Sequence, residues 1–307
     1  MTTLTIRDFR ADDAEAAAAA HRAGRDHLVL TPEVFTWLNG HQPEGAHYRC
    51  LVAELDGRVV GSVRCGVVTG TTTRGVGFAN GSVLPEYRRR GAFTALLAAA
   101  ERHLAEQGVV EVHSWVDEEP GSLAFAAARG YTGGRQAYFG GRDLALPLPE
   151  APAPPAGVEL RPASDWVADP YPIFLVEADA ARDEPGEVEM DAADYEEFLN
   201  GDWARPDLDR DLTVVAVVDG EPVAFSAAQT DGVDRYWSAF TACRRAFRGR
   251  GLSKLAKLES LRRAREAGYR RAYTSNDATN APMLAINAWL GYERCASERK
   301  FTRRLDG

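Results

Sequence analysis

One segment joins an apolar strand pattern, an Arg/Gly loop and a helical pattern, and its loop reads Arg-Gly-Arg-Gly-Leu-Ser over residues 248–253. The first turn of a helix has backbone N–H groups without intrahelical partners, and the helix dipole makes that end positive. Gly249 and Gly251 have no Cβ, so a ligand can approach the backbone closely. Arg248 and Arg250 supply planar, charge-assisted donors. The segment therefore predicts a phosphate site suited to a pyrophosphate.

The same pattern occurs earlier in the chain, at residues 88–93, where Arg88 and Gly91 each precede their counterparts by 160 positions. We call residues 88–93 the first copy and residues 248–253 the second. Other features repeat with it. An Asp-Gly turn at 56–57 has a counterpart at 219–220, and a Gly-Tyr pair at 130–131 has one at 291–292. Repetition of one short loop by chance would not bring these features along. The chain is therefore predicted to be a tandem repeat.

Other readings of the Arg/Gly loop agree less well with the sequence. A dinucleotide-binding loop would need a third glycine three residues after Gly251, where Lys254 stands, and no Gly-x-x-x-x-Gly-Lys-Ser/Thr run is present. A nucleic-acid surface would explain the arginines, but the net charge of −9 has the wrong sign. We therefore expect no nucleic-acid partner.

Both copies resemble the coenzyme A pyrophosphate loop of the GNAT superfamily of N-acetyltransferases, Arg/Gln-x-x-Gly-x-Gly/Ala after a strand. The second copy has the small Ser253 in the last place, whereas the first has Phe93. The resemblance extends to the late helix, where Asn280 matches the coenzyme-contacting Asn of the family and Asn287 stands where the family has a Tyr that protonates the thiolate. In the first copy, Glu119 and Ala126 occupy these two positions.

The order of strand and helix patterns predicts a mixed α/β sheet in each copy: strand, two helices, three strands, helix, strand, helix, strand. With 307 residues the chain is long enough for two such domains. A segment with five prolines between residues 145 and 157 predicts a stiff linker. We expect an N-terminal GNAT-like domain at 1–145, partly degenerate, a linker at 146–157, and a C-terminal catalytic domain at 158–307.

Composition sets further limits. The four cysteines show no paired spacing and the six histidines no ligand spacing, so we expect neither disulfides nor a metal site. The alanine run near the N-terminus is short and flanked by charges, and no apolar run is long enough to span a membrane. We expect a cytoplasmic protein without a membrane partner.

The resemblance assigns acetyl-CoA to the second copy. The expected coenzyme contacts are the strand end before the loop, the loop itself and two asparagines near the late helix: Thr241, Ala242, Cys243, Arg248, Gly249, Arg250, Gly251, Leu252, Ser253, Asn276 and Asn280. The first copy offers a possible second site at Val83, Arg88, Arg89, Arg90 and Gly91.

The catalytic candidates are Glu184 and Asn287. Acidic residues dominate 177–202. One of the acids in the expected inter-helix loop would attract an ammonium or act as a base through water, and Glu184 is the candidate among Asp183, Glu184, Glu187 and Glu189, although a solvated acidic face would look the same. Asn287 is either a site residue or a helix residue hydrogen-bonded to a neighbour. Cys243 is favoured as a buried strand residue, because no histidine follows His113 to activate it.

The expected activity is acetyl-CoA-dependent acetylation of a primary amine on a small molecule or peptide, by direct attack in a ternary complex. The missing Tyr leaves an alternative open, a non-catalytic protein that binds or senses acyl-CoA.

Overall fold

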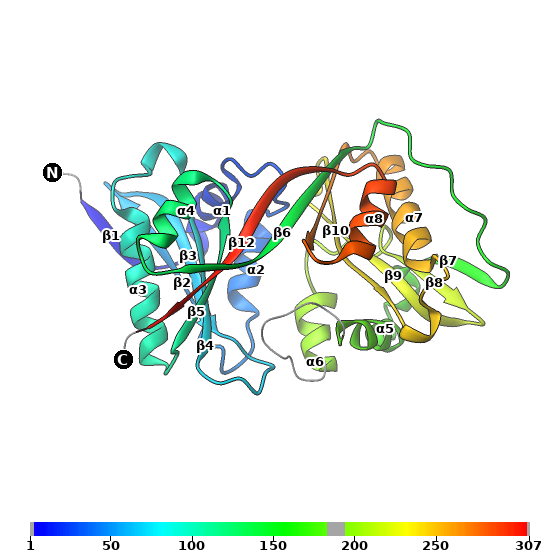
Figure 1. Cartoon of the computed structure of the whole chain (residues 1–307), viewed down its shortest axis with the longest axis horizontal. Helices are drawn as coiled ribbons and strands as arrows, with labels where there is room; N and C mark the ends of the chain where they lie inside the picture. Colours follow the sequence, from blue (N-terminus) through cyan, green and yellow to red (C-terminus); the bar gives the residue numbers. More distant parts are fainter. Residues whose placement is uncertain (1–2, 183–193, 306–307) are drawn as a thin grey trace. The chain divides into compact units, whose positions relative to one another are not determined.

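The computed structural model describes residues 3–182 and 194–305. It divides into two compact units, unit 1 (Met1–Ala137 with Ser297–Gly307) and unit 2 (Tyr138–Ala296). Each unit has helices on both faces of a mixed sheet (Figure 1). The predicted mixed α/β class is confirmed.

Unit 1 contains the elements of the first repeat. These are β1 (Leu4–Asp8), α1 (Ala14–Arg22), α2 (Pro32–Gly40), β2 (Arg49–Leu55), β3 (Arg58–Val67), β4 (Val76–Val83), α3 (Ala92–Glu106), β5 (Glu111–Asp117), α4 (Pro120–Ala127) and the start of β6 (Thr132–Asp143). Thr31 caps α2 by accepting from the backbone N–H of Val34. The Asp56-Gly57 turn joins β2 and β3 with φ of +51° and +81°, as expected for a tight hairpin.

Unit 2 repeats this order. Its elements are β7 (Val158–Pro162), α5 (Tyr171–Ala181), α6 (Tyr195–Phe198), β8 (Val214–Val218), β9 (Glu221–Thr230), β10 (Arg235–Cys243), α7 (Leu252–Glu266), β11 (Arg271–Asp277), α8 (Ala281–Trp289) and the start of β12 (Glu293–Arg304). In the described residues, α6 ends at Phe198 and the chain continues as a π-helical turn to Trp203.

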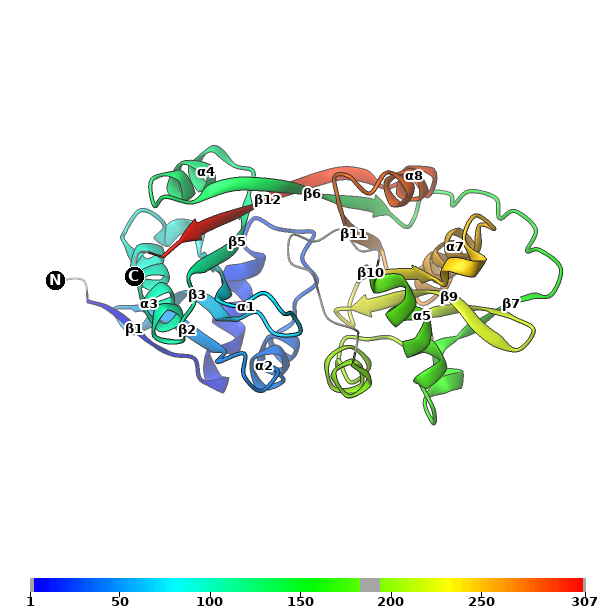
Figure 2. The ribbon, with the colours of Figure 1, turned by 60° about the horizontal axis from the view of Figure 1, so that its bottom comes forward.

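Alternation along the strands places helices on both faces of each sheet (Figure 2). In unit 1, Leu51 packs in the core under α3 and α4, whereas its neighbour Cys50 packs under α1 and α2. In unit 2, Val215 faces α5 and α6, while Ala216 faces α7. The helices that follow the Arg/Gly loops, α3 and α7, therefore each share a face with the next helix, α4 or α8.

The last strand of each unit comes from the other half of the sequence. In unit 1, β5 pairs antiparallel with β12 from Glu298↔Asp117 to Arg304↔Glu111, and Phe301 enters the core. In unit 2, β6 lies next to β11, and Leu144, just after β6, enters that core. The compact units therefore differ from the continuous segments 1–145 and 158–307 expected from the sequence, because strand pairing brings together residues far apart in the chain.

The proline-rich stretch has neither helix nor strand from residue 147 to residue 155. Leu148 and Ala151 in it pack against the core of unit 2. No helix in the described part of the chain is both long enough and apolar enough to cross a membrane.

Candidate active site

The central strands of unit 2 separate toward their carboxyl ends. β10 and β11 are paired in parallel from Arg235↔Arg271 to Ser238↔Thr274, but β10 continues to Cys243 and β11 to Asp277. A cleft between two such strands leaves backbone N–H and C=O groups available to a ligand.

A β-bulge lies where this separation begins. Ser238 of β10 pairs with Ala228 of β9, and the next pair is Thr241 with Ser226, so β10 advances three residues while β9 advances two. Bulges redirect backbone groups and occur preferentially near active sites. In unit 1, the β3–β4 pairing runs from Gly61↔Val83 to Val67↔Gly77 without a shift.

The Arg/Gly loop follows β10 through a short 3₁₀ turn, and Gly251 is the N-cap of α7. Gly249 and Gly251 have φ of +76° and +77°, a conformation that glycine adopts readily. No side chain caps α7 in the described structure, and a Cβ built on Gly251 has nothing within 4 Å. The first N–H groups of the helix therefore adjoin open space, as an anion site requires.

Two arginines support this loop. The Nε of Arg248 donates to the carbonyl of Cys243 at 3.3 Å, which ties the loop to the end of β10. Arg250 donates to the carbonyl of Ala246 at 3.4 Å and lies over the ring of Phe247. Both guanidinium groups are thus held beside the N-terminus of α7.

The other expected contacts at this end lie on β10 and at the start of α7. The hydroxyl of Ser253 donates to the carbonyl of Ala242 at 3.3 Å, so the small side chain turns toward the strand. Burial raises the pKa of the Cys243 thiol, and this disfavours the thiolate that nucleophilic attack would need. Thr241 contacts Ser226 through its hydroxyl at 3.3 Å.

The asparagines expected near the late helix take part in two hydrogen bonds. Asn280 is the N-cap of α8 and accepts from the backbone N–H of Met283 at 3.3 Å. Asn287 is buried and donates to the Oδ1 of Asn276 at 2.5 Å. The remaining oxygen of Asn287 is buried and has no partner in the described structure.

On the acceptor side, Glu184 lies outside the described residues, as do Asp183, Glu187 and Glu189. Nearby Asp202 is described, and burial raises the pKa of its carboxyl. Tyr236 on β10 is fully buried in the core of unit 2, and its hydroxyl contacts that of Ser260 at 2.7 Å, so it is a core residue.

Unit 1 has the same loop with different details. Gly91 is the N-cap of α3 with φ of +85°, and Arg88 donates to the carbonyl of Val83 at 3.1 Å. Arg90 lies over the ring of Tyr87, as Arg250 does over Phe247. Arg89, however, has φ of +64°, where the second copy has Gly249. A side chain in this left-handed region carries backbone strain.

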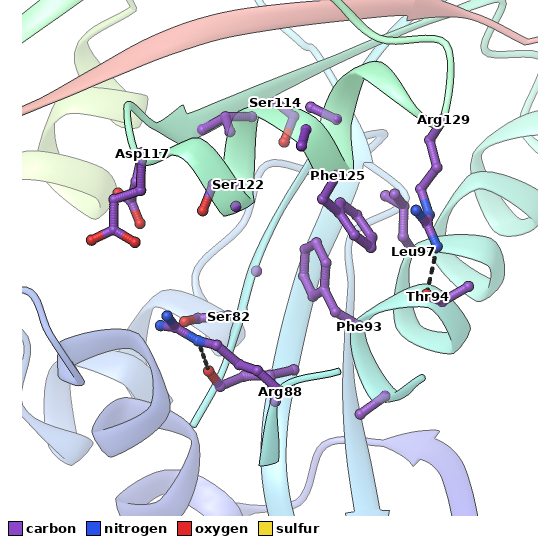
Figure 3. A pocket seen from close by; sticks show the side chains of 18 of the residues that line it. Ser82, Arg88, Phe93, Thr94, Leu97, Ser114, Asp117, Ser122, Phe125 and Arg129 are labelled. Atoms are coloured by element: carbon purple, nitrogen blue, oxygen red, sulfur yellow. Dashed lines mark hydrogen bonds between the residues drawn. The ribbon is translucent and has the colours of Figure 1, made fainter. Parts of the chain in front are cut away.

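A cavity of about 610 Å³ lies in unit 1 between the separated ends of β4 and β5, beneath α3 and α4 (Figure 3). The pairing of these strands runs from Val76↔Glu111 to Phe78↔His113 and then stops. The possible second coenzyme site contributes four lining residues: Val83, Arg88, Arg89 and Gly91.

Two contacts in unit 1 lie at the separated ends of β4 and β5. Phe93 of α3 and Phe125 of α4 face each other within the cavity, with ring centroids 5.3 Å apart (Figure 3). Asn80 reaches across the separated strands, and its Oδ1 accepts from the backbone N–H of Trp115 at 2.8 Å. The sequence indicated the Phe93 part of the first contact, because Phe93 departs from the family pattern. No sequence pattern indicated the contact between Asn80 and Trp115.

The comparisons with known proteins agree with the tandem arrangement. The model of the acetyltransferase (GNAT) family matches residues 15–131 and again residues 167–292. Two relatives are both named mycothiol acetyltransferase. The one from Nocardioides sp. is 28% identical over 221 residues, covering 68% of this chain and 74% of the relative. The one from Brachybacterium faecium is 34% identical over 235 residues, covering 71% of this chain and 66% of the relative.

Solved structures resemble the whole chain. A tandem GNAT protein from the clavulanic acid biosynthesis pathway has a TM-score of 0.75 and 22% identity, with 99% of each chain covered. A GCN5-related N-acetyltransferase from Sphaerobacter thermophilus has a TM-score of 0.73 and 20% identity, covering 98% of this chain and 95% of that one. At these identities the structures support the fold.

Proposed function

Because the chain belongs to the GNAT family, whose members are acetyl-CoA-dependent N-acetyltransferases, we propose that its transfer reaction takes place in unit 2, with the donor on the loop Gly249–Ser253. Unit 1 then serves as a structural partner whose own cleft is obstructed. The acceptor is a primary amine on a small molecule or peptide.

The observation that carries this assignment is the bulge between Ser238 and Thr241. Acetyl transfer needs a hydrogen-bond donor for the oxyanion that develops on the thioester carbonyl. A bulge at the start of the cleft turns a backbone N–H of β10 out of the ladder, where it becomes available for this purpose. The matching strand of unit 1, β4, is regular.

The residues around the cleft favour direct transfer from donor to amine. Cys243 is the thiol on β10 nearest the loop, and burial disfavours its thiolate, so an acyl-cysteine intermediate has no support. Binding both reactants in one complex lowers the entropic part of the barrier. Glu184 stays the sequence-based candidate for a base.

We expect Arg248→Ala to weaken acetyl-CoA binding by 10- to 100-fold, since a charge-assisted phosphate contact is worth ~1.5–3 kcal/mol. The measurement is titration calorimetry. Arg88→Ala is the matched control, because Arg88 makes the same loop contact, to the carbonyl of Val83, that Arg248 makes to that of Cys243. Unchanged affinity in Arg248→Ala would show that Arg248 only shapes its loop, and an affinity lowered only in Arg88→Ala would place the coenzyme on the loop of unit 1.

We expect the wild-type chain to bind one acetyl-CoA and Phe93→Ser to bind two. The substitution installs the residue of the second copy and removes one ring of the Phe93–Phe125 pair from the cleft. Equilibrium dialysis with radiolabelled acetyl-CoA gives the stoichiometry, and Phe125→Leu is the control for lost ring packing. Two molecules bound by the wild type would show that Phe93 does not obstruct unit 1.

The experiment that tests the proposed function is a thiol-release assay with acetyl-CoA and a panel of amines. The panel includes the amine precursor of mycothiol, because both relatives are named mycothiol acetyltransferase. Amine-dependent thiol release supports an enzyme, and its product identifies the acceptor. Binding of acetyl-CoA without thiol release for any amine would favour the non-catalytic alternative.

A further inference from the structure

Lys257 is a lysine in the middle of α7 that is only 1% exposed. Its Nζ donates to the hydroxyl of Thr274 at 3.3 Å, and that hydroxyl donates to the carbonyl of Ser238 at 3.1 Å. Ser238 and Thr274 form the last β10–β11 pair before the strands separate. The ammonium group therefore lies where β10 and β11 begin to separate, next to the bulge.

No described carboxylate forms an ion pair with Lys257. The titratable groups on the surrounding elements are Tyr236 on β10, Tyr292 after α8 and Arg142 on β6. Burial raises the pKa of both tyrosines, so both are neutral, and the ring of Tyr292 lies 5.5 Å from the Nζ. Arg142 donates to the carbonyls of residues 146 and 147. An ammonium buried without an anion is destabilising unless a ligand supplies one.

The first repeat shows which way this position faces. Leu97 and Ser114 stand 160 residues before Lys257 and Thr274, and both line the cavity of unit 1. In unit 1 this helix position therefore faces the space between the separated strands, and it is occupied by leucine. By the repeat, we infer that Lys257 has the same orientation in unit 2, where a lysine replaces this apolar residue.

The cleft of unit 2 also lacks an acid where the resemblance predicts one. The amide of Asn287 is engaged with Asn276 and is no proton donor to a thiolate. Asn276 is two residues beyond Thr274 on β11, so its side chain points to the same face, about 7 Å further along the strand. Lys257 is thus a neighbouring group able to replace the missing acid.

We propose that Lys257 protonates the sulfur of coenzyme A as it leaves, in place of the absent tyrosine. The amine nitrogen forms a bond to the acetyl carbon, the carbon–sulfur bond breaks, and its electron pair stays on sulfur. The proton of the Lys257 ammonium passes to that sulfur and yields the free thiol. The proton that the nitrogen gives up as the amide forms then recharges Lys257 through water. The proposal rests on the placement of the reaction in unit 2.

The protonation behaviour of the group suits this role. Burial alone lowers the pKa of Lys257 to about 7. A proton donor works best when its pKa is close to the working pH. An ordinary lysine would hold its proton too tightly.

The test uses Lys257→Met, with Lys254→Met as the control in the same helix, where the Lys254 ammonium lies 3.6 Å from the ring centre of Trp289. We expect kcat to fall by about 100-fold or more in Lys257→Met. The wild-type kcat should decline as pH rises above about 7, and this decline should be absent from Lys257→Met. The control should keep both the rate and the pH profile.

A binding measurement gives a readout that does not need turnover. The wild type and Lys254→Met should bind coenzyme A more tightly than desulfo-coenzyme A, because only coenzyme A has a thiolate that can pair with the Lys257 ammonium. Lys257→Met, which lacks the ammonium, should bind the two ligands with equal affinity. A Lys257→Met variant that keeps this preference, whatever its rate, would overturn the role of Lys257. A Gly251→Val variant that keeps amine-dependent activity would instead overturn the placement of the reaction in unit 2.

Discussion

Gly251→Val is expected to abolish acetyl transfer, whereas Gly91→Val leaves turnover within a few-fold of the wild type. Both glycines are N-caps in the left-handed region, with φ of +77° and +85°, and a Cβ at either has nothing within 4 Å. A β-branched residue at such a φ is strained by ~1–3 kcal/mol. The backbone strain is the same in both variants. Only at Gly251 does the new side chain also obstruct the proposed binding of the coenzyme phosphates.

The measurements are thiol release and thermal unfolding of the two variants side by side. Similar losses of stability, with a loss of turnover of at least about 100-fold confined to Gly251→Val, are the expected result. Activity that survives at Gly251→Val and disappears at Gly91→Val would move the reaction to unit 1. It would then be the cavity between β4 and β5 that holds the donor.

Lys257→Met is expected to stabilise the fold at neutral pH and below. The pKa of Lys257 is lowered from 10.5 to about 7, so between these values the folded state binds fewer protons than the unfolded state. Stability therefore rises with pH across this window, and the full penalty is present below pH 7. Its size is roughly 3–5 kcal/mol, which the methionine variant avoids.

Urea unfolding of wild type and Lys257→Met, repeated at several pH values from 6 to about 10, gives the difference in unfolding free energy as a function of pH. The difference should shrink as pH rises. Lys254→Met should follow the wild type, because that lysine is not fully buried. Parallel curves for wild type and Lys257→Met would mean that Lys257 has an ordinary pKa. If Lys257→Met is more stable but less active than the wild type, Lys257 contributes to the reaction at a cost to stability.

Local patterns in the sequence determined much of the fold and the outline of the site. A strand precedes each Arg/Gly loop as predicted, and both Asp-Gly turns join neighbouring antiparallel strands. The loop glycines at 91 and 251 begin helices as expected. These features depend on residues close together in the chain, through backbone conformation, capping and periodicity. Because the pattern repeats after about 160 residues, each local feature could be identified in both copies.

Only the tertiary structure decided which distant residues meet. Residues 298–304 complete the sheet of unit 1 beside β5, because an alternating strand pattern does not specify its partner. The bulge at Ser238–Thr241 depends on register with β9, and register is a property of the pair of strands. Lys257 stands between Ala256 and Leu258 in α7, and a charged side chain gives no sequence signal of burial. It is buried because its helix face turns toward Thr274 and the diverging strands.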